Sequence, residues 1–213
     1  MKRAVYIGGF INGKQLAEGV ADALTVYYDA VDAFTFSNAM DIPNTIRRAV
    51  QGVDVFTHSA GMLALAGTNP NRIAAFGPPL PTTPLALVGR TVRKTVRMHT
   101  PGIGIQTRAD VRAVGVYEAG AVAEVFAHPK GNFGRLGQVA AFNAVHAGIA
   151  AEQSGIPTSL VYFDGDEYFQ LSAAQEAEAV GGGVHVQRIP GIHDELALRP
   201  EQTLRQVDIE QLL

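Results

Sequence analysis

The chain has 213 residues and contains no cysteine. This absence excludes disulfide bonds, thiolate metal ligands and a cysteine nucleophile. Long apolar runs are also missing, because no stretch of the sequence is long enough to span a bilayer and the first apolar run is too short for a secretory signal. We therefore expect a soluble, cytoplasmic protein with no membrane as a partner.

The sequence also lacks an excess of charge of either sign. It has 17 Lys and Arg against 20 Asp and Glu, for a formal net charge of −3. This balance gives no reason to expect nucleic acid as a partner. Hydrophobic residues make up 47% and charged residues 17%, which is typical of a folded globular protein. We expect a single domain over residues 1–213, of unknown oligomeric state.

Apolar segments typical of strands alternate with amphipathic segments typical of helices. The first part predicts strands at residues 3–7, 31–36, 53–56 and 72–76, with helices at 12–24, 41–52 and 60–67. The last part predicts strands at 158–163 and 184–189, a helix at 172–180, and a C-terminal helix that begins near residue 199. Such alternation predicts an α/β fold with a mostly parallel sheet of about six strands and helices on both faces.

Residues 80–155 interrupt this alternation. They contain two glycine-rich loops between segments of helical character. We expect a helical insertion over one edge or end of the sheet, with residues 80–135 as a lid or cap. Apolar side chains in this segment, among them Met98 and Phe133, predict one wall of an apolar pocket.

A serine stands between a short apolar strand and an apolar helix. The sequence there is Thr57-His58-Ser59-Ala60-Gly61. A serine in a sharp turn between a strand and a helix is the arrangement of a nucleophile elbow, although its usual first glycine is replaced here by threonine. Serine is also a common helix cap, so this stretch alone leaves both interpretations open.

Two further polar sites follow later strands. Asp164 and Asp166 come directly after the strand at 158–163, and His193 follows the strand at 184–189. Open α/β sheets place their sites at the carboxyl ends of strands, so we expect these side chains to lie near Ser59. Taken singly, an aspartate here could shape a turn and the histidine could be a surface residue. Their order along the chain, Ser then Asp then His, is that of an α/β-hydrolase triad.

At these residues the sequence resembles the α/β-hydrolase superfamily, over nearly the whole chain. Residues 57–61 are similar to the elbow, 160–169 to the acid strand, and 191–193 to the histidine loop. In the family, an apolar residue follows the acid three places later, which selects Asp166, with Phe169, over Asp164. The family's histidine often follows glycine directly, whereas Ile192 intervenes here.

The resemblance implies a small serine esterase or lipase-like enzyme that cleaves a carboxylic ester or thioester. Ser59 would be the nucleophile, His193 would take its proton, and Asp166 would orient His193. The small-molecule substrate would be the partner, and neither a metal nor a cofactor would be needed. Dehalogenases of this fold use an aspartate at the elbow, so Ser59 argues against that branch.

The resemblance also implies where the substrate binds. The backbone N–H groups of Ala60 and Phe10 would form the oxyanion hole. Gly9 and His58 would line the substrate pocket together with the two insertion residues named above. The substrate itself cannot be identified from these residues.

Three other functions stay open at this point. Residues 8–14 fit the P-loop pattern G-x-x-x-x-G-K, although Gln15 stands where a P-loop needs Ser or Thr. Asp164 and Asp166 fit an Asp-x-Asp metal phosphotransferase, although the nucleophilic Asp of such an enzyme normally follows an early strand. A hydrolase fold that serves only as a binding module is the third alternative.

Overall fold

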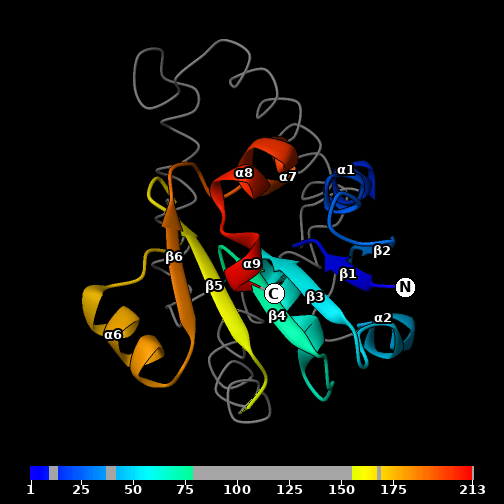
Figure 1. Cartoon of the computed structure of the whole chain (residues 1–213), viewed down its shortest axis with the longest axis horizontal. Coiled ribbons are helices and arrows are strands. Elements are labelled where there is room, and N and C mark those ends of the chain that lie inside the picture. The colour runs from blue at the N-terminus through cyan, green and yellow to red at the C-terminus, as the bar shows by residue number, and fades with distance from the viewer. Residues whose placement is uncertain (10–13, 37–41, 79–154, 167–168, 213) are drawn as a thin grey trace, which may run out of the picture. The chain divides into compact units, whose positions relative to one another are not determined.

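The computed structural model describes residues 1–9, 14–36, 42–78, 155–166 and 169–212 (Figure 1). These residues belong to the first of two units into which the chain divides, Met1–Leu80 with Ala144–Leu213. The expected lid at 80–135, with the pocket residues Met98 and Phe133, lies outside the described residues, and so does Phe10. These assignments therefore stay predictions.

Six strands form one sheet in the order β2-β1-β3-β4-β5-β6, and every neighbouring pair is parallel. The strands are β1 (Arg3–Ile7), β2 (Ala30–Phe34), β3 (Asp54–His58), β4 (Arg72–Phe76), β5 (Thr158–Phe163) and β6 (His185–Ile189). The chain leaves β1 toward β2 on one side and returns to β3 on the other. This reversal between β1 and β3 is the place where α/β sheets bind ligands, at the carboxyl ends of the strands.

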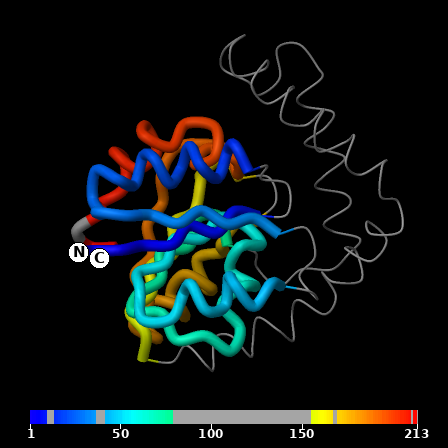
Figure 2. The backbone as a smooth tube through the Cα atoms, turned by 90° about the vertical axis from the view of Figure 1, so that its right-hand side faces the viewer, coloured from blue at the N-terminus to red at the C-terminus, as the bar shows by residue number. Residues whose placement is uncertain are grey.

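Helices cover both faces of the sheet. They are α1 (Lys14–Leu24), α2 (Asn44–Ala49), the 3-10 helix η1 (Ser59–Leu65), α6 (Ala173–Gly181), α7 (Glu195–Leu198), α8 (Pro200–Gln206) and α9 (Ile209–Leu212). Figure 2 shows α1 and the C-terminal helices on one side of the strands, with α2 and η1 on the other. None of the described helices combines the length and the apolar character needed to cross a bilayer.

The main core lies between the sheet and the first of these helical layers. Large side chains at alternate strand positions, such as Tyr6, Phe56 and Phe76, point into it and are fully buried. Val20 and Leu24 of α1 pack against them because they repeat at helical spacing on one face. The strands are held rigid by packing on this core, so residues just beyond their carboxyl ends are held in fixed positions.

The expected architecture, a parallel six-stranded sheet with helices on both faces, is confirmed. The predicted bounds of β1, β4 and β5 agree with the structure, while β2, β3 and β6 are shifted by one or two residues at their ends. Two helices differ in form from the expectation. The helix expected at 60–67 is the 3-10 helix η1, whose tight winding places Gly61 against the backbone of β1.

The second correction concerns the C-terminus. One helix was expected from residue 199 onward, but α8 ends at Gln206 and α9 begins at Ile209. The Asp208 carboxylate accepts a hydrogen bond from the Gln211 N–H at 3.1 Å, so Asp208 caps a new helix instead of continuing the old one. The short helix α7 (Glu195–Leu198) follows the His193 loop, in a stretch for which no element was predicted.

Candidate active site

Ser59 occupies a strained turn at the end of β3. Its φ is +51°, and it is the only non-glycine residue with positive φ in the described part of the chain. This conformation costs a serine about 1–2 kcal/mol, and such strain is typically found at functional sites. The turn also requires Gly61, because a Cβ at that position would lie 2.2 Å from the Ile7 carbonyl oxygen. Strand, strained serine and closely packed glycine are the features of a nucleophile elbow.

Thr57 replaces the first glycine of that turn and is fully buried. Its Cβ is accommodated where the register pairs it with a small residue, Ala75 of β4. Its hydroxyl oxygen has no hydrogen-bond partner among the residues that the structure describes. The turn therefore accepts threonine sterically, while the hydroxyl pays the desolvation cost of a buried polar group.

Asp166 and His193 form a buried hydrogen bond. Asp166 lies three residues beyond β5 and has no exposed surface, and His193 is 5% exposed. The His193 Nδ1–H donates to Asp166 Oδ2 at 2.7 Å, and the Phe169 N–H donates to Asp166 Oδ1 at 2.9 Å. With the proton on Nδ1, the neutral imidazole keeps its lone pair on Nε2, as a general base requires.

The loops that carry these two residues are joined by their backbones. The Asp164 N–H donates to the Ile189 carbonyl at 3.0 Å, and the Gly165 N–H donates to the Gly191 carbonyl at 2.8 Å. A Cβ on Gly165 would lie 2.7 Å from that same Gly191 oxygen, so this approach requires glycine. Asp164 itself is exposed. The two aspartates therefore lie in different environments, which does not favour a shared Asp-x-Asp metal site.

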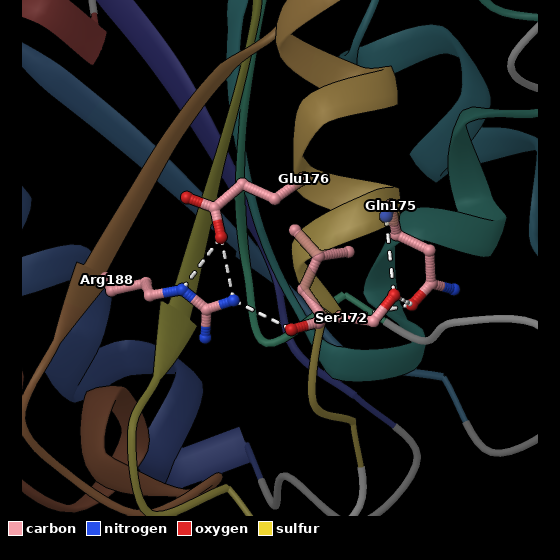
Figure 3. A network of polar contacts seen from close by, with 5 residues as sticks. Ser172, Gln175, Glu176 and Arg188 are labelled. Atoms are coloured by element: carbon pink, nitrogen blue, oxygen red, sulfur yellow. Dashed lines mark hydrogen bonds and ion pairs between the residues drawn. The ribbon is translucent and has the colours of Figure 1, made fainter.

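The chain beyond Asp166 is fixed to β6. The Arg188 guanidinium donates to the Leu171 carbonyl at 2.7 Å and makes two bonds, at 2.8 and 3.0 Å, to one carboxylate oxygen of Glu176 (Figure 3). Ser172 caps α6 by accepting from the Gln175 N–H at 3.3 Å. These contacts fix the segment that follows Asp166. Phe169 lies before this segment, and its ring centroid is 5.5 Å from that of His193.

The side chain of Glu195 holds the loop that carries His193. One Glu195 carboxylate oxygen accepts from the Ile192 N–H at 3.2 Å, and the other pairs with Arg199. Burial raises the pKa of the Glu195 carboxyl above its ordinary value. Gly191, at φ +144°, lies so close that a Cβ there would meet the Glu195 side chain at 2.8 Å. Glycine is thus required in the loop, one place earlier than in the resembled pattern.

Gly77 is a site residue that the sequence interpretation missed. It follows β4 and has φ +50°, and a Cβ there would lie 3.0 Å from His193 Nδ1 and 3.5 Å from Asp166 Oδ2. The sequence suggested only that Gly77 ends a strand. Its place at the carboxyl end of β4, next to β3, is the sequence feature that could have indicated a position near the site.

His58 is buried beside His193. Its Nε2–H donates to the His193 carbonyl at 2.7 Å, and the two rings are 5.1 Å apart. Burial, followed by the proximity of His193, lowers the pKa of His58 to about 4, so His58 is neutral at pH 7. Its predicted place in the substrate pocket stays a prediction.

The expected oxyanion side is described only in part. Gly9 is buried against the elbow, and a Cβ there would lie 3.0 Å from Ser59 Cβ and 3.4 Å from Ser59 Oγ. The loop after β1 therefore reaches the serine, as an oxyanion hole built from that loop requires. Ala60 is buried directly after Ser59. Its N–H and that of Phe10 stay the predicted donors.

His58, His193 and Asp194 are the candidate metal ligands among the described residues, with ligand atoms within 4.8 Å of one another. His193 Nδ1 and His58 Nε2 already make the hydrogen bonds described above. These bonds account for the cluster without an ion.

The Lys14 side chain of the alternative P-loop is 87% exposed and pairs with Glu18 of its own helix at 3.4 Å.

No family model matches the sequence, and no curated protein matches it. Solved structures do. The haloalkane dehalogenase DatA from Agrobacterium tumefaciens C58 is 15% identical, with a TM-score of 0.62 over 99% of this chain and 89% of that one. The enol-lactonase from Burkholderia xenovorans LB400 is 16% identical, with a TM-score of 0.60 over 99% and 91%.

A carboxylesterase structure from the ammonia-oxidizing thaumarchaeon Nitrososphaera gargenis is 12% identical, with a TM-score of 0.61 over 96% of this chain and 87% of that one. The three proteins carry out different reactions, so at these identities the likeness concerns the architecture. The sheet, the strained turn after β3 and the comparisons agree on one conclusion: the chain has the α/β-hydrolase fold.

Proposed function

We propose that this protein is a serine hydrolase that cleaves a small carboxylic ester or thioester through an acyl-enzyme on Ser59. The observation that carries the proposal is the buried 2.7 Å hydrogen bond between His193 Nδ1 and Asp166. In the tautomer with the proton on Nδ1, the imidazole has its basic lone pair on Nε2, beyond the same ends of the strands that present Ser59. A buried carboxylate–imidazole pair of this kind suits proton transfer near neutral pH.

In the proposed reaction, Ser59 Oγ attacks the substrate carbonyl carbon while its proton passes to His193 Nε2. Asp166 stabilises the imidazolium that forms. The imidazolium then gives the proton to the leaving alcohol or thiol, and the acyl group stays on Ser59. Water attacks this acyl group, its proton returns through His193, and the acid leaves a free serine.

The oxyanion of each tetrahedral intermediate needs two preorganised donors, each worth about 3–4 kcal/mol of barrier. We assign these roles to the N–H groups of Ala60 and Phe10. Ala60 lies directly after the nucleophile, and the packing of Gly9 against Ser59 brings the loop that leads to Phe10 to the same place. Gly9, His58, Met98 and Phe133 stay the pocket residues predicted from the sequence, and residues 80–135 stay the predicted lid.

Ester or thioester hydrolysis is favoured over dehalogenation because the elbow residue is serine. The similar structures include an enol-lactonase, a carboxylesterase and a thioesterase domain (TM-score 0.51, 15% identity). All of these act on an acyl carbonyl. The serine and its neighbouring acid–base pair support that same class of reaction here.

The test is labelling with a fluorophosphonate probe, followed by mass spectrometry to map the adduct. We expect one adduct on Ser59 that is lost in Ser59→Ala and in His193→Ala. Absence of labelling in the folded wild-type protein would contradict the proposal. ATP binding that is lost in Lys14→Ala would then favour the P-loop alternative, and failure of both assays would favour a binding module.

A further inference from the structure

His58 connects the strand that presents Ser59 with the loop that presents His193. Because a carbonyl oxygen can only accept, the 2.7 Å contact between His58 Nε2 and the His193 carbonyl has the histidine as donor. The two residues are 135 positions apart in sequence, and β4 and β5 lie between their strands in the sheet. This hydrogen bond therefore joins the side chain of the residue before Ser59 to the backbone of His193.

The surroundings of His58 make this bond strong and uncharged. His58 is 1% exposed, so water does not compete for its N–H. Its charged or titratable neighbours are His193, Asp194 and Asp166. Burial keeps His58 neutral at pH 7, so it donates a hydrogen bond without placing a positive charge beside a base that must gain a proton.

We propose that His58 is a positioning residue whose Nε2–H holds the His193 backbone so that His193 Nε2 can reach the Ser59 hydroxyl. The inference rests on the proposed function, because it requires Ser59 as nucleophile and His193 as base. Proton transfer needs the two heavy atoms within about 2.6–3.2 Å of each other. A displacement of about 1 Å costs about 100-fold in rate, so one lost loop contact is enough to be measured.

Two substitutions of similar size separate positioning from packing. In His58→Gln, an amide N–H takes the place of Nε2–H, whereas His58→Leu fills the space and cannot donate. The readout is the second-order rate of fluorophosphonate labelling at Ser59, measured from about pH 5 to 9 around the ordinary histidine pKa. His185→Leu on β6 is the matched control, because its half-buried side chain lies on the edge strand and makes none of the contacts described for the His193 loop.

We expect His58→Leu to lower the labelling rate about 10- to 100-fold at every pH, and His58→Gln to restore most of it. His185→Leu should be labelled like the wild type. A pure packing role predicts the reverse order, with Leu better than Gln in a buried place. Wild-type rates in His58→Leu, or a rate for Gln no better than for Leu, would overturn the inference while leaving the proposed function intact.

A measurement on the wild-type protein keeps the test independent of whether the variants fold. Two-dimensional proton–nitrogen NMR of the imidazoles should give His58 the Nε2–H tautomer at neutral pH. The Nδ1–H tautomer would exclude donation to the carbonyl and would overturn the inference. If the wild-type protein is not labelled at Ser59 at all, the proposed function fails, and the positioning role falls with it.

Discussion

The turn at Ser59 and the hydrogen-bonded pair of Asp166 and His193 are held in place by different forces. The turn around Ser59 is fixed by shape: a positive φ at Ser59 and close packing of Gly61 against the Ile7 carbonyl. The pair of Asp166 and His193 is fixed by hydrogen bonds, with both Asp166 carboxylate oxygens engaged. The turn therefore depends on close steric packing, and the pair depends on hydrogen bonds to its buried polar groups.

This difference predicts how each region fails. A substitution in the polar pair that keeps the shape of the side chain changes its charge and the imidazole tautomer, so it should affect catalysis more than folding. A substitution in the turn creates overlap with backbone and should affect folding first. The predictions that follow test this contrast, beginning with the largest expected effect.

The largest effect is expected for Asp166→Asn. An amide in place of the carboxylate stabilises the wrong imidazole tautomer and no longer stabilises the imidazolium, which should lower kcat for a p-nitrophenyl ester by about 10⁴-fold. Thermal unfolding should change little because the shape is retained. Asp164→Asn is the matched control, since Asp164 is exposed, and its kcat should stay near that of the wild type. If Asp164→Asn were the more damaging change, the assignment of the acid would be wrong.

Gly61→Ala should have the largest effect on stability. The new methyl group would lie 2.2 Å from a backbone oxygen of β1, and overlap with backbone cannot be relieved by a change of rotamer. We expect a loss of about 3 kcal/mol or more in the free energy of unfolding, measured with urea. The same change at Gly19 in α1, which has open space around it, should instead stabilise by about 0.5–1 kcal/mol. Equal effects at both glycines would contradict the steric account.

The pH dependence of stability should reveal the buried His58. The unfolded chain protonates this histidine near pH 6.5 and the folded chain only near pH 4, so its contribution to stability is lost as the pH falls through this window. The shift corresponds to about 3 kcal/mol between these limits. In His58→Gln this loss should disappear.

The comparison of wild type with His58→Gln also removes the effect of Glu195. Its pKa is raised, so its contribution has the opposite sign and is lost as the pH rises, equally in both proteins. Unfolding free energies should be measured for both proteins at about pH 7 and pH 4.5, on either side of the ordinary histidine pKa. Parallel pH profiles for the two proteins would show that His58 is not buried in its neutral form.

The smallest effects should have opposite signs at two buried threonines. Thr57→Val removes a hydroxyl without a described partner and should stabilise the protein by about 1 kcal/mol. Thr203→Val removes a hydroxyl that donates to the Glu195 carbonyl at 3.2 Å and should destabilise it by about 1 kcal/mol. Urea unfolding of both variants checks the pair, and destabilisation in both would mean that the Thr57 hydroxyl has a partner.

Much of the fold could be predicted from local patterns. The apolar runs of β1, β4 and β5 are short, lie between breaking residues and match their observed bounds, and the alternation with helices indicates a parallel sheet. The 3-10 winding of η1 could not be predicted in this way. An α-helix and a 3-10 helix share the same apolar pattern here, so the local sequence does not distinguish them.

The contact between Asp166 and His193 follows from positions after strands, which the sequence pattern indicates. The spacing to Phe169 favours Asp166 over Asp164, and the structure places the buried Phe169 ring 5.5 Å from the His193 ring. The bond from His58 to the His193 backbone and the closeness of Gly77 to the imidazole could not be predicted. They join segments more than a hundred residues apart, and no local pattern encodes such contacts.

The central claim is that hydrolysis passes through an acyl group on Ser59. The most direct measurement is to mix the protein with excess p-nitrophenyl acetate, quench with acid during turnover, and locate any acetyl group by mass spectrometry. We expect a burst of one p-nitrophenolate per chain and an acetyl group on Ser59, with deacylation slowed in Asp166→Asn. Steady turnover with no acetyl on Ser59, or with the acetyl on another residue, would contradict the account.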